Sequence, residues 1–144
     1  MQKQQMLQAV DDMIAIAEGR NETMAWIQGS GHQPIHKGER TIHGMCLGAM
    51  LDKVAFEQRV TRDVSFSWES ADGQIPQSPL AEAIGKVIVE QYPDRLGFGP
   101  EVQTYIALKG ERFAIVPFND HPDTTPADVV RVLEKARLVL EEAA

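Results

Sequence analysis

Polar side chains crowd the stretch FNDHPDTTPADVV, residues 118–130, which lies between two apolar runs. Asn119 and Asp120 directly follow the apolar segment RFAIVPF, and polar groups at the end of such a segment often line a ligand site. The same side chains commonly hydrogen-bond neighbouring backbone amides in a turn. The stretch therefore indicates either a binding site or a structural turn.

The second half of this stretch predicts the start of a helix. Thr125 suits the N-cap, Pro126 suits the first helical position, and Asp128 stands where a capping box places its acceptor. Apolar residues then recur at helical spacing: Val129, Val130, Leu133 and Ala136. A terminal helix that begins at Pro126 follows from this pattern.

Cys46, the only cysteine of the chain, could act as a catalytic nucleophile. We expect it in the first turns of a helix, where the macrodipole activates thiols, with His43 three residues earlier on the same face. His121 with Asn119 or Asp120 could complete a Cys-His-amide set. The neighbours of Cys46 in IHGMCLGAML are mostly apolar, however, and this favours a buried, unreactive thiol.

A metal or nucleotide site finds less support. His32, His36, His43 and Cys46 fall within fifteen residues, but their spacing matches no common zinc module. The GSG at residues 29–31 lacks the following Lys-Ser or Lys-Thr of a phosphate-binding loop. We therefore expect no metal and no cofactor.

A second candidate for the ligand site is the short extended piece TMAWIQG, residues 23–29, which carries Trp26 and Gln28 near its end. We expect this piece to meet Asn119 and Asp120 beside the helix of Cys46. These four polar or aromatic residues are the candidate ligand-binding residues. They would either hydrogen-bond one another, which makes the cluster structural, or point unpaired into an opening, which would indicate a missing ligand.

The helices that must position these residues follow from apolar spacing and from capping residues. Four are predicted: residues 6–17, a helix from an N-cap at Thr41 through MCLGAMLDKVAF, one from Pro79 to just before Pro93, and the terminal helix. The charged, glycine-containing segment 29–40 is predicted to be an exposed loop.

Strands are predicted from alternation and from turn residues. VQTYIAL and RFAIVPF, joined at Lys109-Gly110-Glu111, predict an antiparallel hairpin over residues 101–119. Alternation in DVSFSW predicts a further strand over residues 62–69. The fold class is therefore α+β: about four helices packed with a small antiparallel sheet, in a single domain of residues 1–144.

Composition excludes several classes of function. The chain has 144 residues and a net charge of −7, whereas a duplex-binding surface needs clustered cations, so nucleic acid is not an expected partner. It has no apolar run of the ~18 residues that a membrane span requires. The N-terminus does not resemble a signal peptide, and a single cysteine suits a reducing compartment, so we expect a cytoplasmic location.

Three pieces of the chain, WIQG at 26–29, MCLGAML at 45–51 and FNDHPDTTPADVV, resemble the hallmarks of a small uncharacterised actinobacterial and actinophage family. That family shows W-C-A-x-G-A-L and W-N-D-x-P-x-R-T motifs. Here Met45 and Phe118 stand where the family has tryptophans, and Thr124 stands where it has arginine. The resemblance implies a shared fold and a phage or bacterial context, without a reaction.

The sequence alone leaves the function unknown and two classes open. The favoured hypothesis is a small cytoplasmic binding or adaptor module with a protein partner, such as a phage accessory protein acting on a host protein. The alternative is a cysteine-dependent hydrolase or transferase that uses Cys46.

Overall fold

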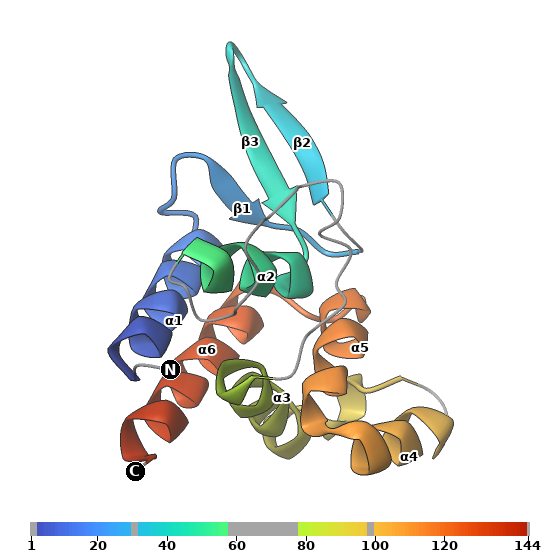
Figure 1. Cartoon of the computed structure of the whole chain (residues 1–144). Helices are drawn as coiled ribbons and strands as arrows, with labels where there is room; N and C mark the ends of the chain where they lie inside the picture. Colours follow the sequence, from blue (N-terminus) through green and yellow to red (C-terminus); the bar gives the residue numbers. More distant parts are fainter. Residues whose placement is uncertain (1–2, 30–31, 58–77, 98–99, 144) are drawn as a thin grey trace.

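The computed structural model describes residues 3–29, 32–57, 78–97 and 100–143, which form an α+β fold (Figure 1). The α-helices are α1 (Lys3–Ala17), α2 (Leu47–Glu57), α3 (Pro79–Gln91), α4 (Pro100–Lys109), α5 (Ile115–Asp120) and α6 (Pro126–Glu142). Two short 3-10 helices are η1 (Pro93–Arg95) and η2 (Glu111–Ala114). The strands are β1 (Met24–Trp26), β2 (His32–Lys37) and β3 (Arg40–Met45). The predicted class is confirmed, whereas the predicted number of helices is too low.

The sheet has the order β1-β3-β2 and is mixed rather than antiparallel. β1 pairs parallel to β3, with Trp26 opposite Met45, and β2 pairs antiparallel to β3, with Lys37 opposite Arg40. Gly38 makes the tight β2–β3 turn with a φ of 63°, a conformation that side chains other than glycine rarely adopt. In Figure 1 the β2–β3 hairpin extends away from the helices.

Two predictions around this hairpin are wrong. The segment predicted as a loop over residues 29–40 contains β2, which carries few apolar side chains and forms because its backbone pairs with β3. Thr41 does not cap a helix, because Arg40–Met45 forms the central strand between β1 and β2. The helix that follows begins only at Leu47.

The predicted hairpin over residues 101–119 is also wrong, because α4, η2 and α5 occupy this range. Val102 and Ile106 stand four residues apart and both lie on the inner side of α4, which is helical spacing. Gly110, with a φ of 132°, joins α4 to η2 instead of closing a β-turn. The strand predicted over residues 62–69 lies outside the described residues.

Helices α1 and α6 run antiparallel, side by side, at one edge of the molecule (Figure 1). The Lys3 ammonium near the start of α1 donates hydrogen bonds to the carbonyls of Glu141 (2.5 Å) and Ala143 (2.9 Å) at the end of α6. Nearer the middle, the Arg137 guanidinium binds the Asp11 carboxylate at 2.8 Å. These contacts fix the C-terminal part of α6 against the first helix of the chain.

Helix α3 lies between α6 and the α4–α5 region. Ser78 caps its N-terminus, Pro79 occupies the first helical position, and the helix ends before Pro93, as predicted. Gly85 lets the backbone of η2 approach closely, since a Cβ atom at this position would come within 2.1 Å of the Glu111 carbonyl oxygen.

One hydrophobic core joins the helices. Its largest fully buried side chains come from every α-helix except α4 and include Met13, Ile16, Leu47, Met50, Leu80, Ile84, Ile88, Ile115, Phe118 and Leu133. Across the described ranges, none of the helices combines the length and apolar character needed to span a bilayer.

Candidate functional site

Asn119 connects the sheet, α2 and α5 at one buried point. Its Oδ1 accepts hydrogen bonds from the Trp26 indole N–H (2.7 Å) and the Leu47 backbone N–H (2.8 Å). Its Nδ2 donates to the Gly29 carbonyl (2.9 Å) and to the Asp120 carboxylate (3.3 Å). Because Asn119 is only 1% exposed, these four bonds satisfy the polar atoms of a side chain that water hardly reaches.

The four candidate ligand-binding residues therefore lie together. The Gln28 side-chain amide donates to the backbone carbonyl of His121, next to Asp120, while Trp26 binds Asn119. Within the described part of the chain, every buried side-chain nitrogen and oxygen has a hydrogen-bond partner. The polar groups bond one another and the nearby backbone. Of the two predicted arrangements, the structure therefore has the hydrogen-bonded cluster and not the one with unpaired groups in an opening.

Cys46 lies at the junction between β3 and α2, not within the helix. It occupies the N-cap position: its sulfur accepts a hydrogen bond from the Ala49 N–H (3.3 Å), and its carbonyl accepts the first helical bond, from the Met50 N–H (2.9 Å). The residue is 5% exposed. Its sulfur thus satisfies a backbone donor at the start of α2 and is closed to a substrate.

The two histidines proposed as partners of Cys46 form other contacts. His43 lies on β3, and its Nδ1 shares a hydrogen bond with Nε2 of His32 on β2 (2.8 Å), with the rings stacked at 5.0 Å. His121 Nδ1 accepts from the Asp123 N–H at 3.1 Å. Burial, together with the neighbouring His43, lowers the pKa of His32 below its usual 6.5. The described residues contain no group of three or more metal-ligating side chains.

The sequence interpretation missed a second polar cluster, in which η1 meets the start of α6. Asp128 Oδ2 accepts from Arg95 (3.0 Å), and its Oδ1 accepts from the Tyr92 hydroxyl (3.3 Å). Arg131 in turn donates to the Tyr92 hydroxyl at 2.8 Å. Arg95 also binds the hydroxyl of Thr124, which donates to the Phe118 carbonyl. These bonds fix residues 121–125, the segment that connects α5 to α6.

The carboxylate of Asp128 also completes the predicted capping box, which is confirmed: Thr125 Oγ1 accepts from the Asp128 N–H, and the Asp128 carboxylate accepts from the Thr125 N–H. Burial alone would raise the pKa of Asp128. The hydrogen bonds from Arg95 and the Thr125 amide outweigh this effect, and the pKa lies below its usual 3.8. Asp128 is therefore ionised and structural.

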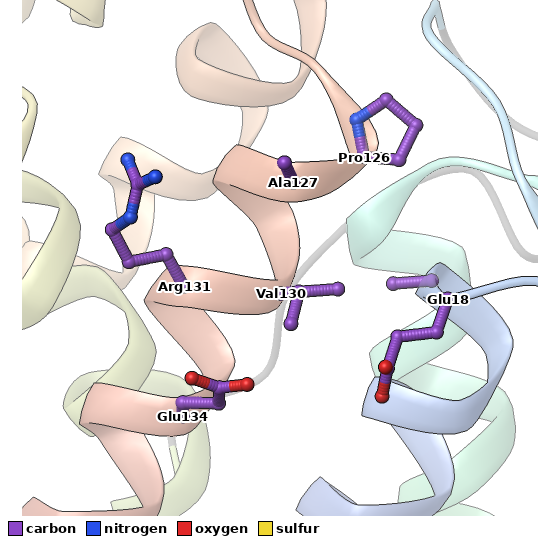
Figure 2. Close-up of a pocket in the computed structure, with 7 residues that line it drawn as sticks. Glu18, Pro126, Ala127, Val130, Arg131 and Glu134 are labelled. Atoms are coloured by element: carbon purple, nitrogen blue, oxygen red, sulfur yellow. The ribbon is translucent and has the colours of Figure 1, made fainter.

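Two of the concave surfaces that the described residues form are candidate places for a ligand. The first is an open cavity of about 480 Å³ between the end of α1 and the start of α6 (Figure 2). Val130 faces Glu18 across it, while the Arg131 side chain points away, toward the Tyr92 hydroxyl that it binds. Its apolar lining residues are Ala17, Pro126, Ala127 and Val130, and none of them is a large hydrophobic side chain exposed to solvent.

The second surface, which we name the α4–α5 groove, is a cavity of about 320 Å³ formed by α4, η2 and α5. Its lining residues are Glu101, Val102, Tyr105, Ile106, Phe113, Val116 and Pro117. Tyr105 is 49% exposed and Val116 42% exposed, and Leu108, one helical turn after Tyr105, is 77% exposed. Three exposed large hydrophobic side chains thus lie in or beside one apolar groove.

Sequence reasoning missed this groove because it assigned the whole region to a β-hairpin. The available signal was the spacing of Val102, Tyr105 and Ile106, which is i, i+3, i+4.

Comparison with family models matches residues 4–138 to a family of unknown function, DUF6197. Searches of curated proteins and of solved structures gave no match to this chain. Since the matched region spans nearly the whole sequence, the chain belongs to the DUF6197 family of unknown function.

Proposed function

We propose that this protein is a small protein-binding or adaptor module that holds an apolar segment of a partner protein in the α4–α5 groove. The observation that carries the proposal is the exposure of Tyr105 and Val116 on the lining of a formed apolar cavity. Exposed apolar surface that gathers in one concave place is typical of interaction sites, whereas single exposed apolar residues are common everywhere.

The groove is built before a partner arrives. The rings of Tyr105 and Phe113 pack edge to face at 5.1 Å, and the Arg112 guanidinium lies 4.3 Å above the Phe113 ring. Arg112 also binds the Glu82 carboxylate on α3 at 3.0 Å, which connects this wall to the core helices. A wall that is already ordered loses little conformational entropy on binding.

The gain from covering the groove is sufficient for a regulated contact. Complete burial of a large apolar side chain contributes about 1.5–3 kcal/mol, so finishing the burial of half-exposed Tyr105 and Val116 and of Leu108 contributes about 3–4 kcal/mol. Contacts by the partner's own apolar residues add to this. The sum supports a reversible complex better than a permanent one.

The biological setting we propose is an actinobacterial or phage protein, acting in the cytoplasm as an accessory factor on a host protein. The motifs of the Cys46 and Asn119 regions support this setting through the family resemblance described above. Catalysis is not part of the proposal, because the Cys46 sulfur is buried and bonded to the Ala49 amide.

Site-specific photo-crosslinking in cells tests the proposed function. Benzoylphenylalanine replaces Tyr105 in one variant and Leu138 in a matched control, because Leu138 is 56% exposed but lies on α6, outside the groove. We expect the Tyr105 position to crosslink to a discrete protein through an apolar segment. The purified partner should then bind the wild-type chain and fail to bind Val116→Asp. Identical crosslinking patterns at both positions would overturn the proposal.

A further inference from the structure

We infer that the occupant of the α4–α5 groove is a cationic amphipathic helix of the partner; this inference rests on the proposed function. Glu101 is the one charged residue among the seven that line the groove. It is exposed and forms no ion pair with the described residues. A partner that covers the groove brings its own charge next to this carboxylate, and a lysine or arginine is the favourable choice.

The charge of the whole protein favours the same partner. The net charge is −7, so a cationic segment is attracted over a longer range than the groove itself. A second copy of this chain would carry −7 as well, and the two copies would repel each other. Near the groove, the guanidinium of Arg112 is bonded to Glu82 and does not oppose a cationic partner as a free charge would.

The elements that form the groove favour a helix over an extended strand. A segment that binds as an added β-strand pairs its backbone with a sheet edge, but α4, η2 and α5 present side chains and no strand edge. A helix satisfies its own backbone hydrogen bonds and can bring a purely apolar face into the groove. A cavity of about 320 Å³ accommodates a few side chains of such a face.

Leu108 extends the apolar surface in the direction that a helix would follow. Tyr105 and Leu108 are three residues apart on α4 and therefore lie on neighbouring positions of its outer side. A helix is normally apolar on one side only, and α4 has buried Ile106 on its inner side and 77% exposed Leu108 on its outer side. A partner helix that binds Tyr105 would also cover Leu108.

Three designed peptides test the inference on the full-length protein. Each is a helix of roughly 18 residues with the same leucine face, and its polar positions are all lysine, all glutamine or all glutamate. Fluorescence anisotropy measures the affinity at low and high salt. We expect the lysine peptide to bind most tightly, with an affinity that falls as salt rises.

Variants assign this binding to the groove. Val116→Asp should weaken all three peptides by more than about tenfold, and Leu138→Asp on α6 should not. Glu101→Gln should weaken only the lysine peptide, by about two- to fivefold, because one exposed ion pair is lost. Glu134→Gln removes the same charge from the surface between α1 and α6 and should have a smaller effect. Circular dichroism and thermal melts check that each variant is folded.

The outcomes separate the inference from the proposed function. If all three peptides bind equally at the groove and Glu101→Gln changes nothing, the cationic partner is wrong while the binding function stands. If no peptide binds the wild-type chain although Tyr105 crosslinks to a discrete partner, the helical occupant is wrong while the binding function stands. If the peptides fail to bind and the crosslinking patterns at Tyr105 and Leu138 are identical, the proposed function falls as well. Self-association that Val116→Asp abolishes would identify a second copy as the occupant and overturn the inference.

Discussion

Replacing Asn119 with leucine tests whether this buried amide holds the sheet, α2 and α5 together. Leucine has a similar size, so the change creates little cavity, but it removes every hydrogen bond of the side chain. The Trp26 indole N–H, the Leu47 backbone N–H and the Gly29 carbonyl then lose a partner at the same time.

The expected cost follows from how far water can reach each of these groups. Leu47 is 0% exposed, so its N–H is left unsatisfied at a cost of about 1–3 kcal/mol. Trp26 and Gly29 are only partly buried, so water can replace part of their bonds, and together they add about 1 kcal/mol. We therefore expect Asn119→Leu to lower the free energy of unfolding by about 2–4 kcal/mol.

Urea denaturation followed by far-UV circular dichroism measures this change. A loss of this size shifts the midpoint by about 1–2 M urea. Asn119→Asp keeps both acceptor positions but loses the donors to Gly29 and Asp120 and buries a carboxylate beside that of Asp120, so it should also destabilise the fold at neutral pH. Asp120→Ala is the control, because its exposed carboxylate contributes one 3.3 Å bond and should matter by less than about 0.5 kcal/mol. A stability of Asn119→Leu within about 1 kcal/mol of wild type would refute the reasoning.

Four further predictions concern other parts of the fold. Gly85→Ala should destabilise by about 2–3 kcal/mol in urea melts, because its Cβ would meet the Glu111 carbonyl; a gain in stability would show that η2 can move away. Thr125→Ala should cost about 1 kcal/mol, and a change below a few tenths would count against the capping box. The lowered pKa of His32 makes the unfolded chain take up a proton first as the pH falls below 6.5, so stability decreases from that pH down to the folded pKa. His32→Asn should flatten this part of the stability profile, and an unchanged slope would contradict the assignment. Finally, Cys46 should resist alkylation until the protein unfolds, and rapid reaction of the native protein would reopen the catalytic hypothesis.

Helix starts could be predicted from the sequence wherever a few neighbouring residues determine the capping interactions. The start of α6 is the clearest example, since Thr125, Pro126 and Asp128 are enough to define a capping box within one turn. Ser78 and Pro79 define the start of α3 in the same way. Such interactions need no contact with distant parts of the chain.

Strand β2 could not be predicted from its own residues. Its residues HQPIHK include a proline, two histidines and only one aliphatic side chain, which is typical of a loop. The segment becomes a strand because β3 offers it a backbone to pair with, from His32 opposite Met45 to Lys37 opposite Arg40. Pairing between segments overrides local propensity here.

The hairpin predicted over residues 101–119 is wrong for a different reason. The aromatic and β-branched residues of this range favour strands, whereas the spacing of its apolar residues is helical. Ala114, Ile115 and Phe118 are buried and follow helical spacing, and Val102 and Ile106 do so on α4. The close approach of η2 to Gly85 on α3, which positions this region, joins residues far apart in the sequence. A single sequence gives no signal for that contact.

For the candidate site, the sequence predicts which residues lie together but not how they bond. Trp26, Gln28, Asn119 and Asp120 were expected to lie together, and the structure brings them together through bonds between segments 93 residues apart. The sequence does not show whether these residues bond one another or point unpaired into an opening. The bonded arrangement depends on the backbone N–H of Leu47 at the start of α2, which donates to Asn119 and which the sequence did not indicate as a partner. That N–H became available only because β3 extends to Met45 and delays the helix.

The start of α2 at Leu47 also determines which groups the Cys46 sulfur contacts. A helix starting after Thr41 would have placed the thiol one turn inside, on the face of His43, whereas the observed start makes its sulfur the acceptor for the Ala49 N–H. Asn119 and Cys46 thereby satisfy two successive parts of the α2 terminus, the Leu47 and Ala49 amides. Polar residues that looked catalytic are needed to begin a buried helix, because α2 has no solvent at its N-terminus to take over these bonds. Apolar surface stays exposed instead at α4, where Tyr105 remains 49% exposed despite its contact with Phe113 and Leu108 remains 77% exposed. This exposure beside an apolar groove is the reason to look for function there.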